Sequence, residues 1–185
     1  RQYLPRRGPA VIVANHNSHL DTLALMTLMP MRMLPRIQPV AAEDYFLKNR
    51  FLAWFAINII GILPIVRKFI PDKPDPLIPA YQALVNGRVL IVFPEGGRGV
   101  PEHLAGLKKG IAHLARRYPQ IPVVPVFMHG LGKTLPKGKF IPVPFFCDVF
   151  VGEPLYGEKN VDVFMQKLQS SFDSLSQQRK FPAWD

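Results

Sequence analysis

The sequence is poor in the residues that build cross-linked or metal-held scaffolds. It contains one cysteine, Cys147, among 185 residues. No internal disulfide can form, and a site with several cysteine ligands is excluded. Cys147 lies in an apolar run, so we expect a small core or strand residue. The chain must rely on an ordinary hydrophobic core, and residues 1–185 are long enough for a single domain with one.

Acidic residues are also scarce. There are 13 Asp and Glu against 23 Lys and Arg, a net charge of +10, in a chain that is 48% hydrophobic with a mean hydropathy of +0.09. Such a protein attracts anions, which include nucleic acid, acidic lipid headgroups and phosphorylated cofactors. Nucleic-acid binders interleave basic residues with exposed aromatic ones, whereas most phenylalanines here lie in apolar runs. We therefore expect an anionic membrane surface as a partner, and no nucleic acid.

No uninterrupted apolar run is long enough to span a bilayer. The longest, residues 51–66, is broken by Asn58, Gly61 and Pro64 and falls short of the roughly 20 residues that a spanning helix needs. Two alternatives remain open, because both leave the same pattern. The run is either a buried helix followed by a strand, or a helix whose apolar face enters the membrane interface. In the second case the flanking basic residues would bind headgroups: Lys48, Arg50, Arg67 and Lys68.

These features predict a peripheral or monotopic membrane protein at the cytoplasmic face. The chain begins at Arg1 and not at methionine. We interpret it as a domain excised from a longer protein or one that has lost an upstream membrane anchor.

Strand-like and helical patterns alternate along the chain. Strands are expected at residues 11–14, 39–42, 62–66, 88–93 and 122–127 and within 140–151, and helices at residues 18–30, 43–60, 77–86 and 111–117 and from residue 161 onward. This order predicts an α/β domain with a mostly parallel or mixed central sheet flanked by helices. Pro142 and Pro144 favour the sheet edge for the last strand. Residues 70–76 are expected to form a proline-rich loop.

A first polar motif, Asn-His-Asn-Ser-His-Leu-Asp, follows the first strand at residues 15–21. On a regular helix His16 and Asp21 would point about 140° apart. They can pair if His16 lies in the strand-to-helix turn and Ser18 is the helix N-cap. A carboxylate would then hold the imidazole in the tautomer that removes a proton from a hydroxyl group.

Two other interpretations of this motif remain. Asp21 could simply complete a capping box with Ser18. His16 and His19 have the spacing of a metal-binding pair, but no further cluster of ligands supports a metal site. We therefore expect no metal.

A second motif, Phe-Pro-Glu-Gly-Gly-Arg-Gly, follows another apolar strand at residues 93–99. The glycines allow a tight turn that exposes backbone N–H groups, and Arg98 offers a planar group suited to phosphate oxygens. The alternative is a plain surface turn. The motif matches neither a Walker sequence nor a dinucleotide fingerprint, and the chain lacks the Gly-x-Ser-x-Gly elbow of lipid hydrolases.

Four segments occur in an order and spacing that resemble the glycerolipid acyltransferase family, the PlsC-like enzymes. They are His16-x4-Asp21, residues 61–67, residues 93–98 and residues 123–126. The resemblance extends from about residue 8 to residue 154. It implies the PlsC-like acyltransferase fold and an O-acyltransferase of glycerophospholipid synthesis or remodelling.

The resemblance implies transfer of a fatty acyl group from an acyl-CoA or acyl carrier protein thioester to the hydroxyl of lysophosphatidic acid or a related lysophospholipid. His16 would be the general base and Asp21 its orienting partner. The acceptor-binding residues would be Arg67, Glu95, Gly96, Gly97 and Arg98. The thioester is a substrate, and no cofactor is expected.

The chain departs from the family where hydroxyl residues are common, because it has Gly97 and Gly99 there. This leaves the acceptor headgroup open. The alternatives are a glycerol 3-phosphate or lyso-aminolipid acyltransferase, and a non-catalytic module that binds anionic lipid.

Overall fold

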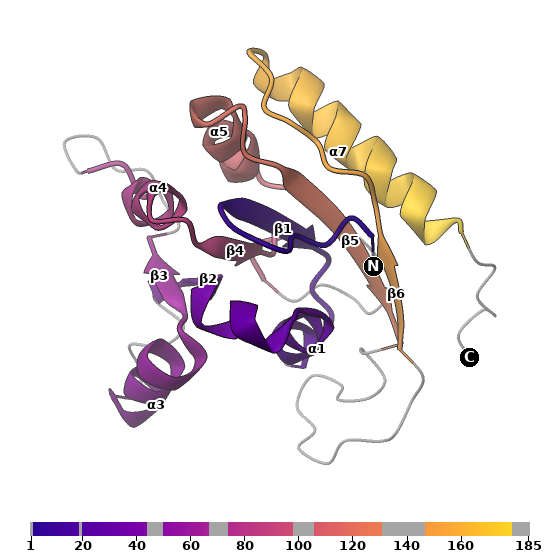
Figure 1. The fold of residues 1–185 in the computed structure, drawn as a ribbon. Helices are drawn as coiled ribbons and strands as arrows, with labels where there is room; N and C mark the ends of the chain where they lie inside the picture. Colours follow the sequence, from indigo (N-terminus) through magenta and orange to yellow (C-terminus); the bar gives the residue numbers. More distant parts are fainter. Residues whose placement is uncertain are drawn as a thin grey trace.

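The computed structural model describes residues 2–18, 20–43, 50–66, 74–97, 106–130 and 147–178. Within them a six-stranded sheet has the order β3-β2-β4-β1-β5-β6 (Figure 1). The strands are β1 (Ala10–Ala14), β2 (Ile37–Ala42), β3 (Leu63–Ile65), β4 (Val89–Val92), β5 (Val123–His129) and β6 (Asp148–Val151). All neighbouring strands are parallel except β5 and β6. The expected α/β class with a mostly parallel central sheet is confirmed.

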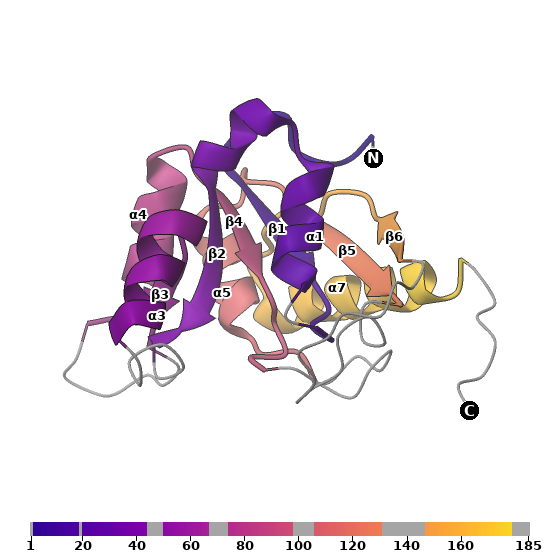
Figure 2. The same ribbon diagram turned by 90° about the horizontal axis from the view of Figure 1, so that it is seen from below.

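Helices cover both faces of this sheet. They are α1 (Asp21–Leu28), the 3-10 helix η1 (Met31–Arg36), α3 (Arg50–Phe55), the π-helical turn η2 (Ala56–Ile60), α4 (Ile78–Val85), α5 (Gly110–Arg117) and α7 (Val161–Ser176). In Figures 1 and 2, α5 and α7 lie behind the sheet as seen from the side of α1. The buried side chains of α4, α5 and α7 form one core cluster, and those of α1 and η1 belong to the other.

Strand β1 lies between β4 and β5 and is buried along its whole length. Because side chains alternate along a strand, Val11 and Val13 pack into the core of α4, α5 and α7, and Ile12 packs toward α1. A strand buried on both faces has an apolar residue at every position, as parallel strands under helices do. This pattern made β1 and β4 predictable.

The edge position of the last strand is also confirmed, since within the described residues β6 pairs with β5 alone. It lies within the expected range of 140–151, of which residues 140–146, with Pro142 and Pro144, lie outside the described residues, as does most of the expected loop at 70–76. The prediction for Cys147 was wrong. This residue is exposed and immediately precedes β6.

The first helix begins later than expected. Its first residue is Asp21, and its N-cap position is Leu20, which has helical backbone angles and makes no side-chain cap bond. Ser18 is therefore not the N-cap, although its Oγ accepts a hydrogen bond of 3.3 Å from the Leu20 N–H. The turn at 15–20 is instead organised by the Asp21 carboxylate, as described below.

The apolar run at 51–66 is mostly exposed or half-buried over residues 53–66, whose burial the structure describes. It forms α3, η2 and β3 at one edge of the sheet (Figure 1), and Gly61 ends the helical part with φ of 77°. Ala56 is buried, but Trp54 and Ile59 are 55% and 60% exposed. Among the described residues no helix is both long and apolar enough to cross a membrane. Of the two alternatives, a buried helix does not describe this segment.

Candidate active site

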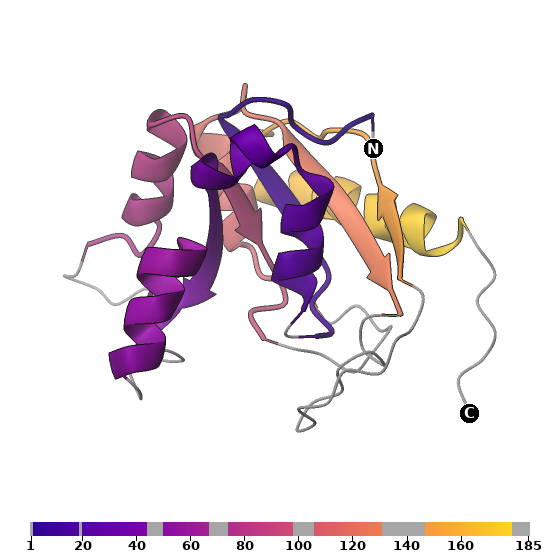
Figure 3. The ribbon, with the colours of Figure 1, turned by 60° about the horizontal axis from the view of Figure 1, so that its bottom comes forward.

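The two polar motifs meet at one end of the sheet. Strands β1 and β4 are parallel neighbours, with Val13 opposite Val92. The carboxyl ends of both strands therefore lie at the same end of the sheet (Figure 3). Ligand sites of open parallel sheets lie beyond the carboxyl ends of the strands. The topology therefore places residues 15–21 beside residues 93–97 although some 75 residues separate them in the sequence.

His16 and Asp21 are in contact. The Nδ1 atom of His16 lies 2.9 Å from Oδ2 of Asp21, and the two side chains are 21% and 0% exposed. The same oxygen accepts the backbone N–H groups of Asn17 at 2.6 Å and Ser18 at 2.8 Å. Because an ionised carboxylate only accepts hydrogen bonds, Nδ1 is the donor in this pair. In the neutral imidazole Nε2 of His16 is then the nitrogen without a proton, as a general base requires.

Asp21 also explains why the turn has its shape. Its bond to the Ser18 N–H is the one that the acidic residue of a capping box makes, and its bond to the Asn17 N–H fixes the residue beside the base. The two interpretations of Asp21 from the sequence are therefore compatible. One carboxylate oxygen both folds the turn and orients the imidazole.

Glu95 joins the second motif to the first. Its Oε1 accepts the backbone N–H of His16 at 2.8 Å, and the side chain is buried. The ring of Phe93 stacks on the imidazole of His16, with centroids 4.2 Å apart and planes inclined by 22°. The structure thus brings Glu95 to the base itself. Glu95 holds the backbone of His16, and Phe93 supports the ring.

Asn15 attaches the start of the first motif to β5. Its Nδ2 donates to the carbonyl of Met128 at 2.8 Å, and its Oδ1 accepts the Met128 N–H at 2.7 Å. Asn15 is buried. The side chain takes the place of a strand residue, so the backbone can turn away from the sheet one position before His16.

The glycine turn directly follows β4 and Phe93. Gly96 has φ of 72°, in the left-handed region that favours glycine, and its N–H bonds the carbonyl of Phe93 at 3.1 Å. Gly97 is exposed, with no atom within 4 Å of the position that a Cβ would occupy. The turn therefore has free space on the side of Gly97. Arg67 and Arg98, the two predicted cations, lie outside the described residues.

Two polar groups beside the base have no hydrogen-bond partner within the described part of the chain. They are Oδ1 of Asp21 and the side-chain amide of Asn17, both buried. Unpaired buried polar atoms cost free energy. They are a feature of this turn that the local sequence pattern does not explain. Over the same residues, no cluster of three possible metal ligands occurs.

Some contacts could not be predicted from either motif alone. The bond from Asn15 to Met128 joins segments far apart in the sequence, and Lys108, which lies against Gly96, is outside the second motif. Phe93 carried a weak signal, since it sits at the end of a strand directly before the glycine turn.

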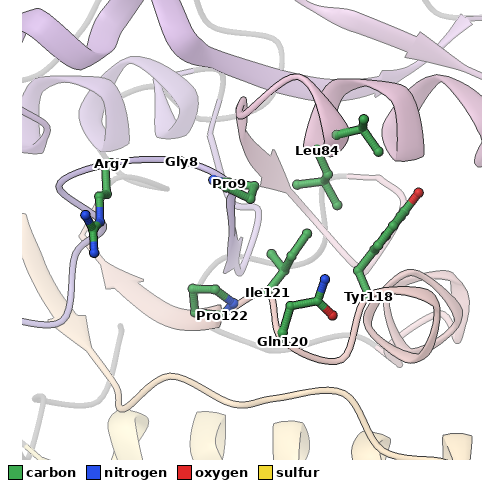
Figure 4. A pocket seen from close by; sticks show the side chains of 9 residues that line it. Arg7, Gly8, Pro9, Leu84, Tyr118, Gln120, Ile121 and Pro122 are labelled. Atoms are coloured by element: carbon green, nitrogen blue, oxygen red, sulfur yellow. The ribbon is translucent and has the colours of Figure 1, made fainter.

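The hollow in Figure 4 lies elsewhere. Its lining includes Pro9 and Pro122, which precede β1 and β5, so it is at the amino ends of these strands. Tyr118 and Leu84 flank it from α5 and α4 (Figure 4). The two motifs are at the opposite ends of the strands.

Comparisons with known proteins identify the family. A family model described as Acyltransferase matches residues 1–129. The 1-acyl-sn-glycerol-3-phosphate acyltransferase alpha of Homo sapiens is 32% identical over 132 residues, which are 68% of this chain and 42% of that protein. The chloroplastic 1-acyl-sn-glycerol-3-phosphate acyltransferase BAT2 of Brassica napus is 28% identical over 152 residues, or 82% of this chain and 42% of that protein.

A solved structure shares the fold. The crystal structure of the 1-acyl-sn-glycerophosphate (LPA) acyltransferase PlsC from Thermotoga maritima aligns with a TM-score of 0.68 and 23% identity, covering 97% of this chain and 71% of that one. The expected PlsC-like fold is confirmed. The chain spans less than half the length of the two relatives named above. With a family model over more than two thirds of its residues, the chain belongs to the acyltransferase family.

Proposed function

We propose that this protein transfers a fatty acyl group from a thioester to the free hydroxyl of lysophosphatidic acid or a related lysophospholipid. The observation that carries the proposal is the pair formed by His16 and Asp21. A half-buried imidazole, held by a fully buried carboxylate through Nδ1, presents its other nitrogen for proton transfer. The names of the relatives, 1-acyl-sn-glycerol-3-phosphate acyltransferases, support this choice of acceptor.

The reaction needs one base and no covalent enzyme intermediate. Nε2 of His16 removes the proton of the acceptor hydroxyl while the oxygen attacks the thioester carbonyl carbon. The C–S bond then breaks, and the thiolate leaving group takes the proton back from the imidazolium. The products are the ester and the free thiol of coenzyme A or of acyl carrier protein. Asp21 stabilises the transient imidazolium, and Phe93 and Glu95 keep the ring and its backbone in place.

The acceptor-binding part of the proposal includes the glycine turn. Backbone N–H groups in such a turn form a concave anion site, and Gly96 provides the left-handed residue that shapes it. We assign Arg98 and Arg67 to the phosphate of the acceptor from their positions in the sequence motifs. Glu95 contributes through the base, because its Oε1 accepts the His16 N–H.

The proposal also includes an anionic lipid bilayer as the site of action. Several exposed apolar side chains belong to α3, to η2 and to the residue after β3, and we call this group the edge patch: Trp54, Phe55, Ile57, Ile59 and Val66. No acidic residue occurs between Asp44 and Asp72, while four basic residues flank the patch in the sequence. Exposed apolar side chains that are flanked in the sequence by basic residues fit the interface of an anionic membrane.

The test of the reaction is replacement of the base. His16→Ala should reduce acyl transfer by at least about 10³-fold, the size of a lost general base together with its positioning. The assay pairs lysophosphatidic acid, glycerol 3-phosphate and a lyso-aminolipid with acyl-CoA and acyl carrier protein donors. His113→Ala is the matched control, because His113 is exposed on α5. Near-normal turnover in His16→Ala would refute the mechanism. No transfer by the unaltered protein to any acceptor would favour a lipid-binding module.

A further inference from the structure

Lys108 and Lys109 are adjacent in the sequence but have different surroundings. The Nζ of Lys109 pairs with Oδ1 of Asp162, in the first turn of α7, at 2.8 Å, and both side chains are largely exposed. Lys108 forms no ion pair within the described part of the chain. Its positive charge is therefore available to a ligand, whereas the charge of Lys109 already has a partner.

Lys108 is attached to the glycine turn through its backbone. Its N–H donates to the carbonyl of Pro94 at 2.9 Å. Pro94 directly precedes Glu95 and the turn, so this bond joins the segment before α5 to the segment after β4. The position of Lys108 therefore depends on the turn and not only on the start of α5.

The side chain of Lys108 lies against Gly96. A Cβ added to Gly96 would be 2.7 Å from both Cε and Nζ of Lys108 and 3.0 Å from its Cδ. Only a residue without a side chain leaves room for this approach. The ammonium group thus lies beside the backbone of the turn and remains accessible to solvent.

The ammonium group of Lys108 is linked to His16 through the backbone of the glycine turn and Glu95. Gly96 follows Glu95, whose carboxylate accepts the backbone N–H of His16 at 2.8 Å. The base, the turn and the ammonium of Lys108 are therefore held in one arrangement by two hydrogen bonds and the peptide chain between them. A phosphate group bound at the glycine turn would therefore lie near the charge of Lys108.

We propose that Lys108 binds a phosphate group of the substrate at the glycine turn, beside His16. This inference rests on the proposed acyl transfer, which offers two phosphates: the phosphomonoester of the acceptor and the phosphates of the donor carrier. In a 1-acylglycerol 3-phosphate only two carbon atoms separate the reacting hydroxyl oxygen from the phosphate ester oxygen. A base that reaches this hydroxyl has the acceptor phosphate close by. An ammonium group is a compact charge well suited to phosphate oxygens, and it adds to the backbone N–H groups of the turn.

The kinetic test compares three single substitutions. Lys108→Met removes the charge but keeps most of the side chain, Lys108→Arg keeps the charge, and Lys109→Met removes the neighbouring charge as the matched control. We expect Lys108→Met to raise the KM for the phosphorylated acceptor about 10- to 100-fold, the usual effect of one charge-assisted hydrogen bond. The kcat should change much less. Lys108→Arg should recover most of the loss, and Lys109→Met should behave as the unaltered protein does.

KM values for the acyl donor, measured beside those for the acceptor, show which of the two phosphates Lys108 binds. A rise in KM restricted to the acceptor assigns Lys108 to the acceptor phosphate, and a rise restricted to the acyl-CoA KM assigns it to the carrier phosphates. A monoacylglycerol acceptor, which has no phosphate, should show no dependence on Lys108 in the first case. Unchanged KM values for both substrates in Lys108→Met would overturn the inference.

A binding measurement makes the inference testable without turnover. Glycerol 3-phosphate and inorganic phosphate should raise the Tm of the protein, and Lys108→Met should lose most of this shift while Lys109→Met keeps it. If no acyl transfer is detected with any acceptor, the proposed function fails, but a shift that depends on Lys108 still supports the phosphate site. An equal shift in Lys108→Met and the unaltered protein would refute the site even in an active enzyme.

Discussion

At the scale of single residues, Oδ2 of Asp21 is the centre of the site. It accepts three hydrogen bonds, from His16 Nδ1 and from the backbone of Asn17 and Ser18. Two of these bonds shape the turn, and the third sets the tautomer of the base. Folding and chemistry therefore share one atom, and a substitution of Asp21 changes both.

Asp21→Asn separates the two effects in part. The amide oxygen can still accept the backbone N–H groups, but the charge that stabilises the imidazolium is lost. We expect kcat to fall about 10²- to 10⁴-fold and the free energy of unfolding to fall by about 1–2 kcal/mol. Steady-state kinetics and chemical denaturation measure the two effects.

The control for this variant is Asp162→Asn. Asp162 pairs with Lys109 at the surface, where ion pairs contribute little to stability. It should leave kcat unchanged. Activity of Asp21→Asn close to that of the unaltered protein would mean that the carboxylate only shapes the turn.

At the scale of secondary structure, close packing of a loop against a helix limits which residues the loop can contain. Gly157 lies shortly after Leu155, which forms an isolated β-bridge with Val123 of β5. A Cβ at Gly157 would lie 2.1 Å from the carbonyl oxygen of Ala115, and its N–H bonds the carbonyl of Pro119 at 3.2 Å. The loop thus lies directly on the end of α5.

Gly157→Ala should push this loop away from α5. We expect a loss of about 1–3 kcal/mol in the free energy of unfolding, as for other overpacked sites, measured by chemical denaturation. Gly106→Ala serves as the control, because nothing lies within 4 Å of its Cβ position. Equal stability of the two variants would mean that the loop shifts freely.

The same scale shows what could be predicted from the sequence. The central strands were predicted within a residue or two because a strand buried on both faces is apolar throughout. The start of α1 was placed three residues early, since the pattern suggested Ser18 as the cap while Asp21 supplies the bonds. The 3-10 helix η1 and the π-helical turn η2 were missed, because their apolar residues do not differ from those of strands and regular helices.

The candidate site was predictable only in part for a related reason. Each motif names residues that are close along the chain, and the pair His16 and Asp21 follows from them. The contacts of Asn15 with Met128 and of Lys108 with Gly96 join residues of a motif to residues outside it that come close only in the folded protein. No local pattern records such contacts.

At the scale of the whole molecule, charge and apolar surface combine at one edge. The net charge is +10, and the edge patch belongs to α3, η2 and the residue after β3, the outermost strand. Long-range attraction to an anionic surface brings such a protein to the membrane, and apolar contacts then hold it there. Salt screens the electrostatic attraction, but it does not screen the apolar contacts.

Vesicle binding tests both the electrostatic attraction and the apolar contacts. The protein should bind vesicles that contain anionic lipid more tightly than neutral ones, and higher salt should weaken this preference. The double variant Trp54→Ser and Ile59→Ser should bind about 10-fold less or weaker still, since it removes two apolar side chains from the interface. Co-sedimentation measures the bound fraction.

Val85→Ser is the matched control for the edge patch. Val85 is 70% exposed on α4, outside the patch, and its substitution should not affect binding. Unaltered vesicle binding of the double variant would mean that another protein segment covers the patch.

The side-chain bridge from Asn15 to Met128 has a consequence for how heat inactivates the protein. A base in an ordinary loop can lose its geometry by local fraying while the rest of the molecule remains folded. Here the side chain of Asn15, the residue before His16, makes two hydrogen bonds to the backbone of Met128 in β5. The backbone N–H of His16 itself bonds Glu95, in the segment that follows β4. Releasing the base therefore requires opening the centre of the sheet, so loss of activity and global melting should be one cooperative event.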